Sequence, residues 1–485
     1  MYFDVLRSPL AFLAGSLPAA KISGELACYE QWWETGGRAI SDATDRARTP
    51  WLRMFDLSGV RVDEILYAPE YWRMLRAGYR SGVVWRAFEE NSLLPAYLWI
   101  YATSFYDPGL SCPYTVSLAT AVALQKNGTP GLREHFLPQL LRRDDTVWQG
   151  ATWMTEIKGG SDLGASVETT AKHSGDRWLL TGEKYFASNA GAELAVVAAR
   201  PDGSAAGVRG LALFLLPRRR EDGSLNYFIR RLKNKIATRS VPTGEVELRA
   251  SEAHLLGKAE EGIYRILEVL NLSRVANSIG SVALAQRAIA DALLFAEKRR
   301  AFGKTIISHP LLQKQFEERL DELQAAAALA WEAARLFDEI RLENPPYSDR
   351  YHLFRLLAHL AKLWTAEFAV QTAKWGMEVH GGLGVLEEFS AERWLREAMI
   401  MAIWEGTSHR QALDGLEVME RKQGHHLLFE HLAACAPPED LAAMKARIGE
   451  FLSLPGGARE RNADALILDL ARFTARILMN RAPLR

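Results

Sequence analysis

Residues 150–162 read GATWMTEIKGGSD, and the sequence changes character at this stretch. Before it, the pattern is mostly helical and rich in Trp and Leu. After it, short apolar runs such as 178–180 and 194–199 alternate with turn sequences such as His-Ser-Gly-Asp at 173–176, a pattern typical of β-strands. Beyond Gly257 the apolar residues recur every three or four positions, as they do in helices. The sequence therefore predicts a mixed α+β protein in the order helices, strands, helices.

The chain has 485 residues, which is too long for one hydrophobic core, so we expect several domains. We expect a helix over 63–90 near the N-terminus and long helices over 316–340 and 351–379. The predicted segments are an N-terminal helical domain at 1–149, a middle β-domain at 150–256, a C-terminal helical bundle at 257–424 and a helical C-terminal extension at 425–485.

The composition, 48% hydrophobic and 24% charged, is that of a globular protein and excludes a disordered or collagen-like chain. Lys+Arg and Asp+Glu both number 59, so attraction of the whole molecule to nucleic acid or to an anionic membrane is not expected. The cysteines Cys28, Cys112 and Cys435 are scattered without metal-ligand spacing, which favours a reducing compartment, the cytoplasm, and no metal site. No apolar run is expected to reach the roughly 18 residues of a membrane span.

Two motifs in the β-domain could hold a flat cofactor. The glycines of the 150–162 stretch, followed by Ser161, form a tight loop whose free backbone N–H groups can approach a planar ring or an anion. Phe186 and Ser188 lie two residues apart on a predicted strand and so share one face, where the ring could cover a cofactor and the hydroxyl could donate to it. An ordinary turn and an aromatic residue packed in a sheet would give the same patterns.

Two further motifs lie at helix ends. Arg299, in the run Arg-Arg-Ala-Phe-Gly-Lys that ends at Lys304, could bind a diphosphate or could simply face solvent beside a glycine cap. The cluster Gly381-Gly382-Leu383-Gly384 ends a long helix, where the backbone could meet a nucleotide or the glycines could cap the helix. The cluster is not a Rossmann fingerprint, because no strand precedes it.

Glu405 lies between Trp404 and Gly406, directly after the apolar run 398–403. An apolar setting raises the pKa of a carboxylate toward neutrality, which suits a general base, and the glycine leaves room for a substrate. A lone glutamate in such a loop is more often a solvated residue.

Taken together and in this order, the five motifs resemble those of the acyl-CoA dehydrogenase family over about residues 50–425. The stretches Asp-Leu-Ser-Gly-Val-Arg-Val-Asp at 56–63 and Gly-Leu-Ser-Cys-Pro at 109–113 are similar to the AidB-like branch of that family. The resemblance implies an N-terminal helical domain, a middle β-barrel-like domain and a C-terminal four-helix bundle. It further implies FAD between the last two domains and self-association as a homotetramer or homodimer.

The resemblance also implies residue roles. Glu405 would be the catalytic base that removes the α-proton of an acyl-CoA, while the β-hydride passes to the flavin and an electron-transfer flavoprotein reoxidises it. Asn271 departs from the Asp that some members carry, and Ser273 leaves no rival carboxylate there. The residues assigned to the substrate are Ser161, Asn271, Arg274 and Gly406. Those assigned to FAD are Met154, Thr155, Gly160, Ser161, Phe186, Ala187, Ser188, Arg299, Phe302, Gly381, Gly382, Gly384, Trp404, Thr407 and Ser408.

Three alternatives stay open. An AidB-like flavoprotein could bind DNA, but residues 424–485 carry eight Lys+Arg against seven Asp+Glu, so this tail is barely basic. Oxygen could replace the electron-transfer flavoprotein as acceptor. His409 and Arg410 place potential positive charge near the base, which would suit an anionic substrate. The length and branching of the acyl chain are not encoded in any motif.

Overall fold

The computed structural model describes residues 3–14 and 23–480, and the chain divides into two compact units. The β unit comprises residues 31–103 and 107–273, and the helical unit comprises 1–30, 104–106 and 274–485. Helix α10, Gly262–Lys298, begins in the β unit and continues into the helical unit. Each unit is described by itself below.

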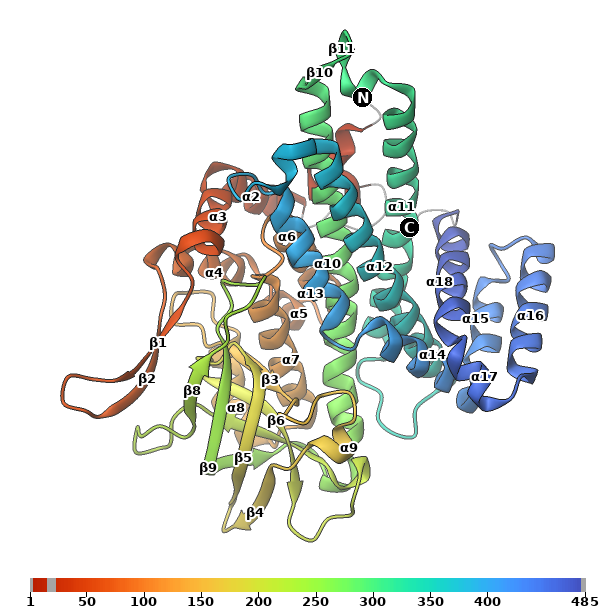
Figure 1. The fold of residues 1–485 in the computed structure, drawn as a ribbon. Helices are drawn as coiled ribbons and strands as arrows, with labels where there is room; N and C mark the ends of the chain where they lie inside the picture. Colours follow the sequence, from red (N-terminus) through yellow and green to blue (C-terminus); the bar gives the residue numbers. More distant parts are fainter. Residues whose placement is uncertain (1–2, 15–22, 481–485) are drawn as a thin grey trace. The chain divides into compact units, whose positions relative to one another are not determined.

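A seven-stranded sheet forms the centre of the β unit (Figure 1). Five of its strands close a ring, because β6 pairs with β4, β4 with β5, β5 with β9, β9 with β7, and β7 with β6 again. β3 and β8 join β6 and β9, respectively. The predicted β-barrel-like domain is confirmed. The strands are β3 Gly150–Trp153, β4 Thr170–Ser174, β5 Arg177–Ser188, β6 Leu194–Pro201, β7 Ala212–Pro217, β8 Phe228–Leu232 and β9 Thr243–Leu255.

The barrel interior is filled by the apolar runs that the sequence displays. Strands β6 and β7 read LAVVAARP and ALFLLP, and nearly all of their residues are buried. Val197, Phe214 and Leu216 lie in one core cluster with Trp153 of β3. Fully burying such a side chain stabilises a fold by about 1.5–3 kcal/mol, so these strands form a rigid frame for the loops between them.

The helix predicted over 63–90 is wrong at its start. Residues Arg61–Leu66 form strand β2, which pairs with β1, Trp51–Phe55, as an antiparallel hairpin. The turn follows from Asp56, whose Oδ1 accepts hydrogen bonds from the N–H groups of Ser58 and Val60. The helices of the β unit are α3 Arg38–Ala47, α4 Pro69–Ser81, α5 Trp85–Glu89, α6 Leu94–Tyr106, α7 Ser111–Asn127, α8 Pro130–Leu140 and α9 Leu163–Ser166, with α6 reaching residues 104–106 of the helical unit.

The run at 178–180 and the predicted strand that carries Phe186 and Ser188 form the single strand β5. Its pairing with β9 shifts register between Leu180 and Gly182. Gly182 has φ 153°, and a Cβ there would lie 2.5 Å from Thr169 Oγ1. The glycine therefore marks a close approach of two chain segments within a strand, not the end of one.

The helical unit is built on α12, Asp349–His380, which packs against α11, α13, α14, α15 and α18. Asn277 of α10 donates to the carbonyl oxygen of Met401 on α13 at 3.1 Å, and Phe316 of α11 contacts the Trp375 ring of α12 edge-on. The two predicted long helices are confirmed as α11 and α12. The remaining elements are α1 Pro9–Leu13, α2 Ser23–Trp32, β10 Arg300–Ala301, β11 Lys304–Thr305, α11 Pro310–Ile340, α13 Ala391–Ile403, α14 Ser408–Lys422, α15 Gly424–Leu432, α16 Pro438–Ser453, α17 Gly456–Arg461 and α18 Ala463–Met479.

One helical segment differs from the sequence expectation that no apolar run reaches membrane-spanning length. Among the described residues, Ala259–Lys298 is long and apolar enough to cross a membrane, with a mean hydropathy of 1.4 over its most apolar window. Of that window, 83% is buried inside the protein, as in the core helix of a globular fold.

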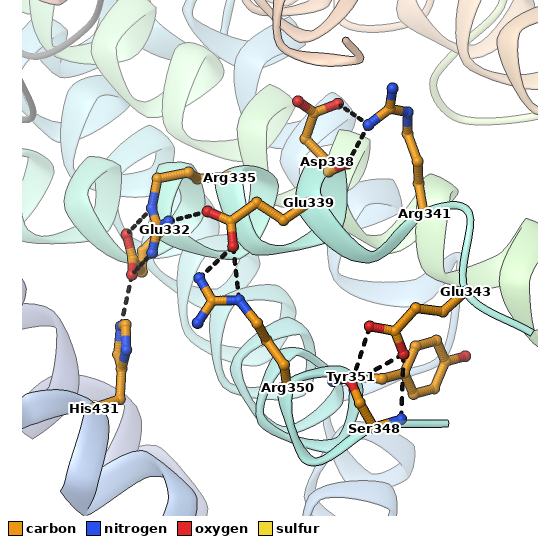
Figure 2. A network of polar contacts seen from close by, with 10 residues as sticks. All are labelled: Glu332, Arg335, Asp338, Glu339, Arg341, Glu343, Ser348, Arg350, Tyr351 and His431. Atoms are coloured by element: carbon orange, nitrogen blue, oxygen red, sulfur yellow. Dashed lines mark hydrogen bonds and ion pairs between the residues drawn. The ribbon is translucent and has the colours of Figure 1, made fainter. Parts of the chain in front are cut away.

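A polar network attaches the C-terminal extension to the rest of the helical unit (Figure 2). His431 of α15 lies 2.6 Å from Glu332 Oε1 of α11, and Arg335 donates to both carboxylate oxygens of Glu332. Arg335 also pairs with Glu339, which accepts from Arg350 of α12. Burial of Glu332 opposes ionisation, but the hydrogen bonds from His431 and Arg335 prevail and lower its pKa to about 2.

Candidate active site

The Glu405 turn, residues 402–406, joins the end of α13 to the start of α14. Glu405 has φ 60° and Gly406 has φ 102°, so two successive residues adopt left-handed conformations. Such a conformation is unfavourable for glutamate, and it persists only where the surroundings enforce it. A Cβ at position 406 would lie 2.5 Å from Gln411 Nε2, so the glycine is required sterically as well as conformationally.

Side chains from three helices hold the carbonyl oxygens of this turn. Lys362 Nζ of α12 donates to the carbonyl oxygens of Ala402 at 3.0 Å and Gly406 at 2.5 Å. Gln411 Nε2 of α14 donates to the carbonyl oxygen of Glu405 at 2.8 Å, and Arg274 Nε of α10 does so at 3.3 Å. These contacts fix the backbone from which the Glu405 side chain extends.

The Glu405 carboxylate is left free to react. Its Oε2 is buried and has no hydrogen-bond partner among the described residues. Burial raises the pKa of Glu405 to about 7, against the lowering effects of Arg274 and Lys362. A carboxylate with a pKa near neutrality is ionised in part at physiological pH and can then accept a proton, as a general base must.

Arg410, which the sequence offers as free positive charge, is paired. Its guanidinium contacts Asp414 on the same helix, and Asp414 also lies 3.7 Å from Arg274. Asp414 therefore offsets part of both charges. His409 is exposed. The charge available for an anionic substrate is smaller than the sequence indicates.

The other residues predicted around Glu405 have separate environments. Trp404 Nε1 is buried without a hydrogen-bond partner in the described chain, and Thr407 precedes α14. Ser408 donates to the Glu367 carboxylate of α12. A Cβ on Gly381 or Gly382 would meet nothing within 4 Å, whereas one on Gly384 would lie 2.3 Å from the Met377 carbonyl oxygen. Packing alone explains Gly384, while Gly381 and Gly382 leave the backbone open to a ligand.

Arg299 and Phe302 are not brought to the Glu405 turn. Arg299 follows the last residue of α10, about 37 Å along that helix from Arg274 at 1.5 Å per residue. Phe302 is 96% exposed in the β10–β11 hairpin, at the opposite end of the bundle from α14 (Figure 1). A cofactor role for this motif therefore stays a prediction.

The predicted cofactor residues of the β unit lie on β5 and directly after β3, which are separated by β6 and β4 in the sheet order. Phe186 of β5 is 54% exposed, and Ser188 is half-buried on the same side of the strand. Ala187 points into the barrel core, so only its backbone could meet a ligand. Met154 and Thr155 follow β3, and a Cβ on Gly160 would lie 2.4 Å from Thr155 Oγ1. Ser161 is exposed, and Asn271 is buried on α10 one turn before Arg274.

Sequence reasoning missed the residues that anchor the 156–162 loop. Glu156 is buried and accepts hydrogen bonds from Lys184 Nζ at 2.6 Å, Thr169 Oγ1 at 2.6 Å and the Glu168 N–H at 2.7 Å. Lys184 is buried as well and also donates to the Ala198 carbonyl oxygen. The only sequence signal was a charged residue at an inward-facing position of a predicted strand.

The residues present fit a large planar cofactor such as FAD. In the β unit, the Phe186 ring is 54% exposed, with Lys233 Nζ over it at 4.7 Å from the ring centroid. In the helical unit, Trp404 Nε1 is a buried donor without a partner among the described residues, and the backbone of Gly381 and Gly382 is unobstructed. Each of these groups can accept a further contact from a bound cofactor.

Three domain families match the chain. They are the AidB N-terminal domain at residues 14–145, the acyl-CoA dehydrogenase middle domain at 151–251 and the acyl-CoA dehydrogenase C-terminal domain at 260–419. Acyl-CoA dehydrogenase family member 11 of Caenorhabditis elegans is 32% identical over 82% of this chain and 67% of its own length. Putative acyl-CoA dehydrogenase AidB of Escherichia coli is 29% identical over 79% of this chain and 71% of its own.

Solved structures share the fold. The apo form of the protein Bd2924 superposes with a TM-score of 0.88, at 29% identity over 99% of this chain and 97% of that one. Caenorhabditis elegans ACDH-11 in complex with C11-CoA superposes with a TM-score of 0.81, at 24% identity over 99% and 91%. Members of this family bind FAD, and acyl-CoA dehydrogenase of Bacillus anthracis was solved in complex with FAD. With its three matching domains and its relative of 32% identity, the chain belongs to the acyl-CoA dehydrogenase family and has an AidB-type N-terminal domain.

Proposed function

We propose that this protein is an FAD-dependent acyl-CoA dehydrogenase that converts an acyl-CoA to a 2-enoyl-CoA. Glu405 accepts the α-proton of the acyl-CoA, and the hydride lost from the β-carbon would go to the bound cofactor. When bound, FAD supplies the two-electron acceptor. The observation that carries the proposal is the buried, unpartnered Glu405 Oε2, on a carboxylate whose pKa is raised to about 7.

The chain's own residues provide the conditions for proton removal. The contacts from Lys362, Gln411 and Arg274 hold the turn, so the carboxylate does not need to be reorganised when substrate binds. The backbone N–H of Glu405 is the donor that we expect to polarise the thioester carbonyl, which makes the α-proton more acidic. Trp404 and Gly406 flank Glu405 in the chain, and we expect Gly406 and Arg274 to contact the acyl group.

The test is an anaerobic titration of the purified flavoprotein with short, long and branched acyl-CoAs, monitored by flavin absorbance. We expect one class to bleach the flavin, and Glu405→Gln to slow bleaching by about 10²- to 10⁴-fold, which is the range that a general base contributes. The matched control is Glu417→Gln on α14, a partly exposed carboxylate paired with Arg421, which should bleach normally. Absence of bleaching by every thioester would contradict the proposal.

Electron acceptor, assembly and location are parts of the same proposal. We propose an electron-transfer flavoprotein as acceptor, with oxygen as the alternative. Stopped-flow reoxidation of the reduced enzyme by each acceptor separates them.

A homotetramer or homodimer would bring the Arg299 motif of one copy to the site of another, which light scattering and Arg299→Gln can test together. The free thiols of Cys28, Cys112 and Cys435 support the cytoplasm as location.

DNA binding is the alternative function, supported by the AidB N-terminal domain match. The tail offers it little charge, because Arg447 pairs with Asp469, Arg459 with Glu420 and Arg476 with Asp321. A salt-dependent DNA-binding assay with and without residues 424–485 tests it. A steep salt slope that is lost on truncation would favour the alternative.

A further inference from the structure

Lys362 is a wholly buried lysine in the middle of α12, and its head group points at the Glu405 turn. It is 0% exposed, and its Nζ donates to the carbonyl oxygens of Ala402 and Gly406. Burial lowers the pKa of Lys362 to about 7, while Glu405 raises it. Burying an ammonium group is costly, so a lysine at this point of a core helix requires compensation. The two carbonyl oxygens and the nearby carboxylate supply it.

A second contact works beside Lys362. His359, one turn earlier on α12, places Nδ1 2.8 Å from Gln411 Oε1. Burial lowers the pKa of His359 to about 3, so the ring is neutral and its Nδ1–H donates to the amide oxygen. The amide nitrogen of Gln411 is thereby turned toward the carbonyl oxygens of Glu405 and Gly406. We call Lys362 and Gln411 the carbonyl clamp.

The carbonyl clamp holds the backbone at a turn that contains two successive residues with positive φ. Ala402, Glu405 and Gly406 all have their carbonyl oxygens held by clamp residues, and the last two have positive φ. A turn of this kind needs external hydrogen bonds to keep one conformation. Lys362 makes no ion pair with Glu405 in the part of the chain that the structure describes, so its charge acts on the carboxylate through space.

The charges around the pair are few. Glu405 is influenced by Arg274 of α10 and Lys362 of α12. Lys362 is influenced by Glu405, Arg274 and Glu367. Arg274 is offset by Asp414 of α14, which also pairs with Arg410. Lys362 differs from Arg274 in that both of its hydrogen bonds go to backbone carbonyl oxygens, whereas Arg274 also forms an ion pair with Asp414.

We propose that Lys362 is a positioning residue for Glu405, which locks the 402–406 turn through two carbonyl oxygens and keeps the carboxylate ionised by its positive charge. The inference rests on the proposed function. A charge held near the base, but not hydrogen-bonded to it, favours the ionised form without occupying the oxygen that must take the proton.

The test compares Lys362→Met, which removes donor and charge, with Lys362→Arg, which keeps both. Lys374→Met, at an exposed lysine of the same helix that pairs with Glu378, is the control. For Lys362→Met we expect kcat to fall about 10- to 100-fold with KM within about threefold, because the base is misplaced and more often protonated. The rising limb of the pH–kcat profile should move about one unit to higher pH. Lys362→Arg should restore the position of that limb.

A second readout needs no substrate. Amide hydrogen exchange of residues 402–407, followed by mass spectrometry, should be faster in Lys362→Met than in wild type or Lys374→Met. If Lys362→Met does not fold, Lys362→Gln, which keeps an N–H donor but not the charge, must still shift the pH limb. A folded neutral variant with an unchanged limb overturns the inference. An inactive wild type whose turn loses protection in Lys362→Met contradicts the proposed function but supports the clamp.

Discussion

Two buried lysines differ in how they interact with a neighbouring carboxylate, because one is hydrogen-bonded to it and the other is not. Lys184, in the β unit, donates directly to Glu156, whose oxygens also accept from a hydroxyl and a backbone N–H. Lys362, in the helical unit, donates to two backbone carbonyl oxygens and leaves the Oε2 of Glu405 without a partner. A fully bonded carboxylate can anchor a loop but cannot easily take a proton. A carboxylate with a free oxygen and a raised pKa can do so.

The largest expected effect on stability lies at the anchoring pair. Lys184→Met leaves the Glu156 charge buried without a counter-ion, which we expect to lower the free energy of unfolding by about 3–5 kcal/mol. Lys158→Met is the control, because Lys158 pairs with Glu168 in the same loop but both are more than half exposed, and it should cost under about 1 kcal/mol. Urea denaturation measures both. Equal losses in the two variants would mean that Lys184 is not an anchor.

A third carboxylate extends the comparison, because Glu332 is paired and its pKa moves down, not up. Its pKa falls from 4.5 to about 2 in the folded protein, so its contribution is complete above about pH 4.5 and is lost as the pH falls through about 2. The shift corresponds to about 3 kcal/mol at neutral pH. Glu332→Gln should remove that stability at pH 7, and the difference from wild type should shrink below pH 4.5. Denaturation at pH 7, 4 and 3 checks this, and a difference that is constant with pH would refute it.

The pH dependence of kcat in the wild-type enzyme should follow the ionisation of the Glu405 carboxylate. With the pKa of Glu405 raised to about 7, kcat should fall tenfold for each pH unit below about 6 and level off above about 7.5. Stopped-flow flavin reduction between pH 5 and 8.5 measures this limb. A limb near pH 4.5, the ordinary value for glutamate, would show that Glu405 behaves like a solvated residue and would remove the contrast with Glu156.

The sequence was informative where chemistry is local. The Trp-Glu-Gly-Thr stretch predicted a base in an apolar setting, and the apolar runs after residue 150 predicted the barrel. The β1–β2 hairpin was missed because its turn depends on side-chain hydrogen bonds of Asp56, which an alternating charged pattern conceals.

The carbonyl clamp could not be predicted in the same way. Lys362 precedes Glu405 by 43 positions and lies in a helix whose lysines would normally face solvent. One signal was present, because His359 and Lys362 are three residues apart and form a polar strip on an otherwise apolar helix face. That spacing does not say what the strip contacts, since tertiary packing alone brings α12 beneath the turn. The Arg299 motif shows the converse, because its pattern is recognisable in the sequence but it lies far along α10 from the Glu405 turn.

The smallest expected effect is that of removing the positive charge of Arg410, five residues after Glu405. Arg410 pairs with Asp414 at a partly exposed site, so Arg410→Gln should cost only about 0.5 kcal/mol of stability. Because this pairing already uses the Arg410 charge, KM for a dicarboxylic acyl-CoA relative to a monocarboxylic one should change less than about twofold. A selective rise in KM for the dicarboxylic substrate would instead assign Arg410 to an anionic acyl group. In that case Arg410 would contribute to substrate specificity, while the other cations near Glu405 would favour the ionised form of the base.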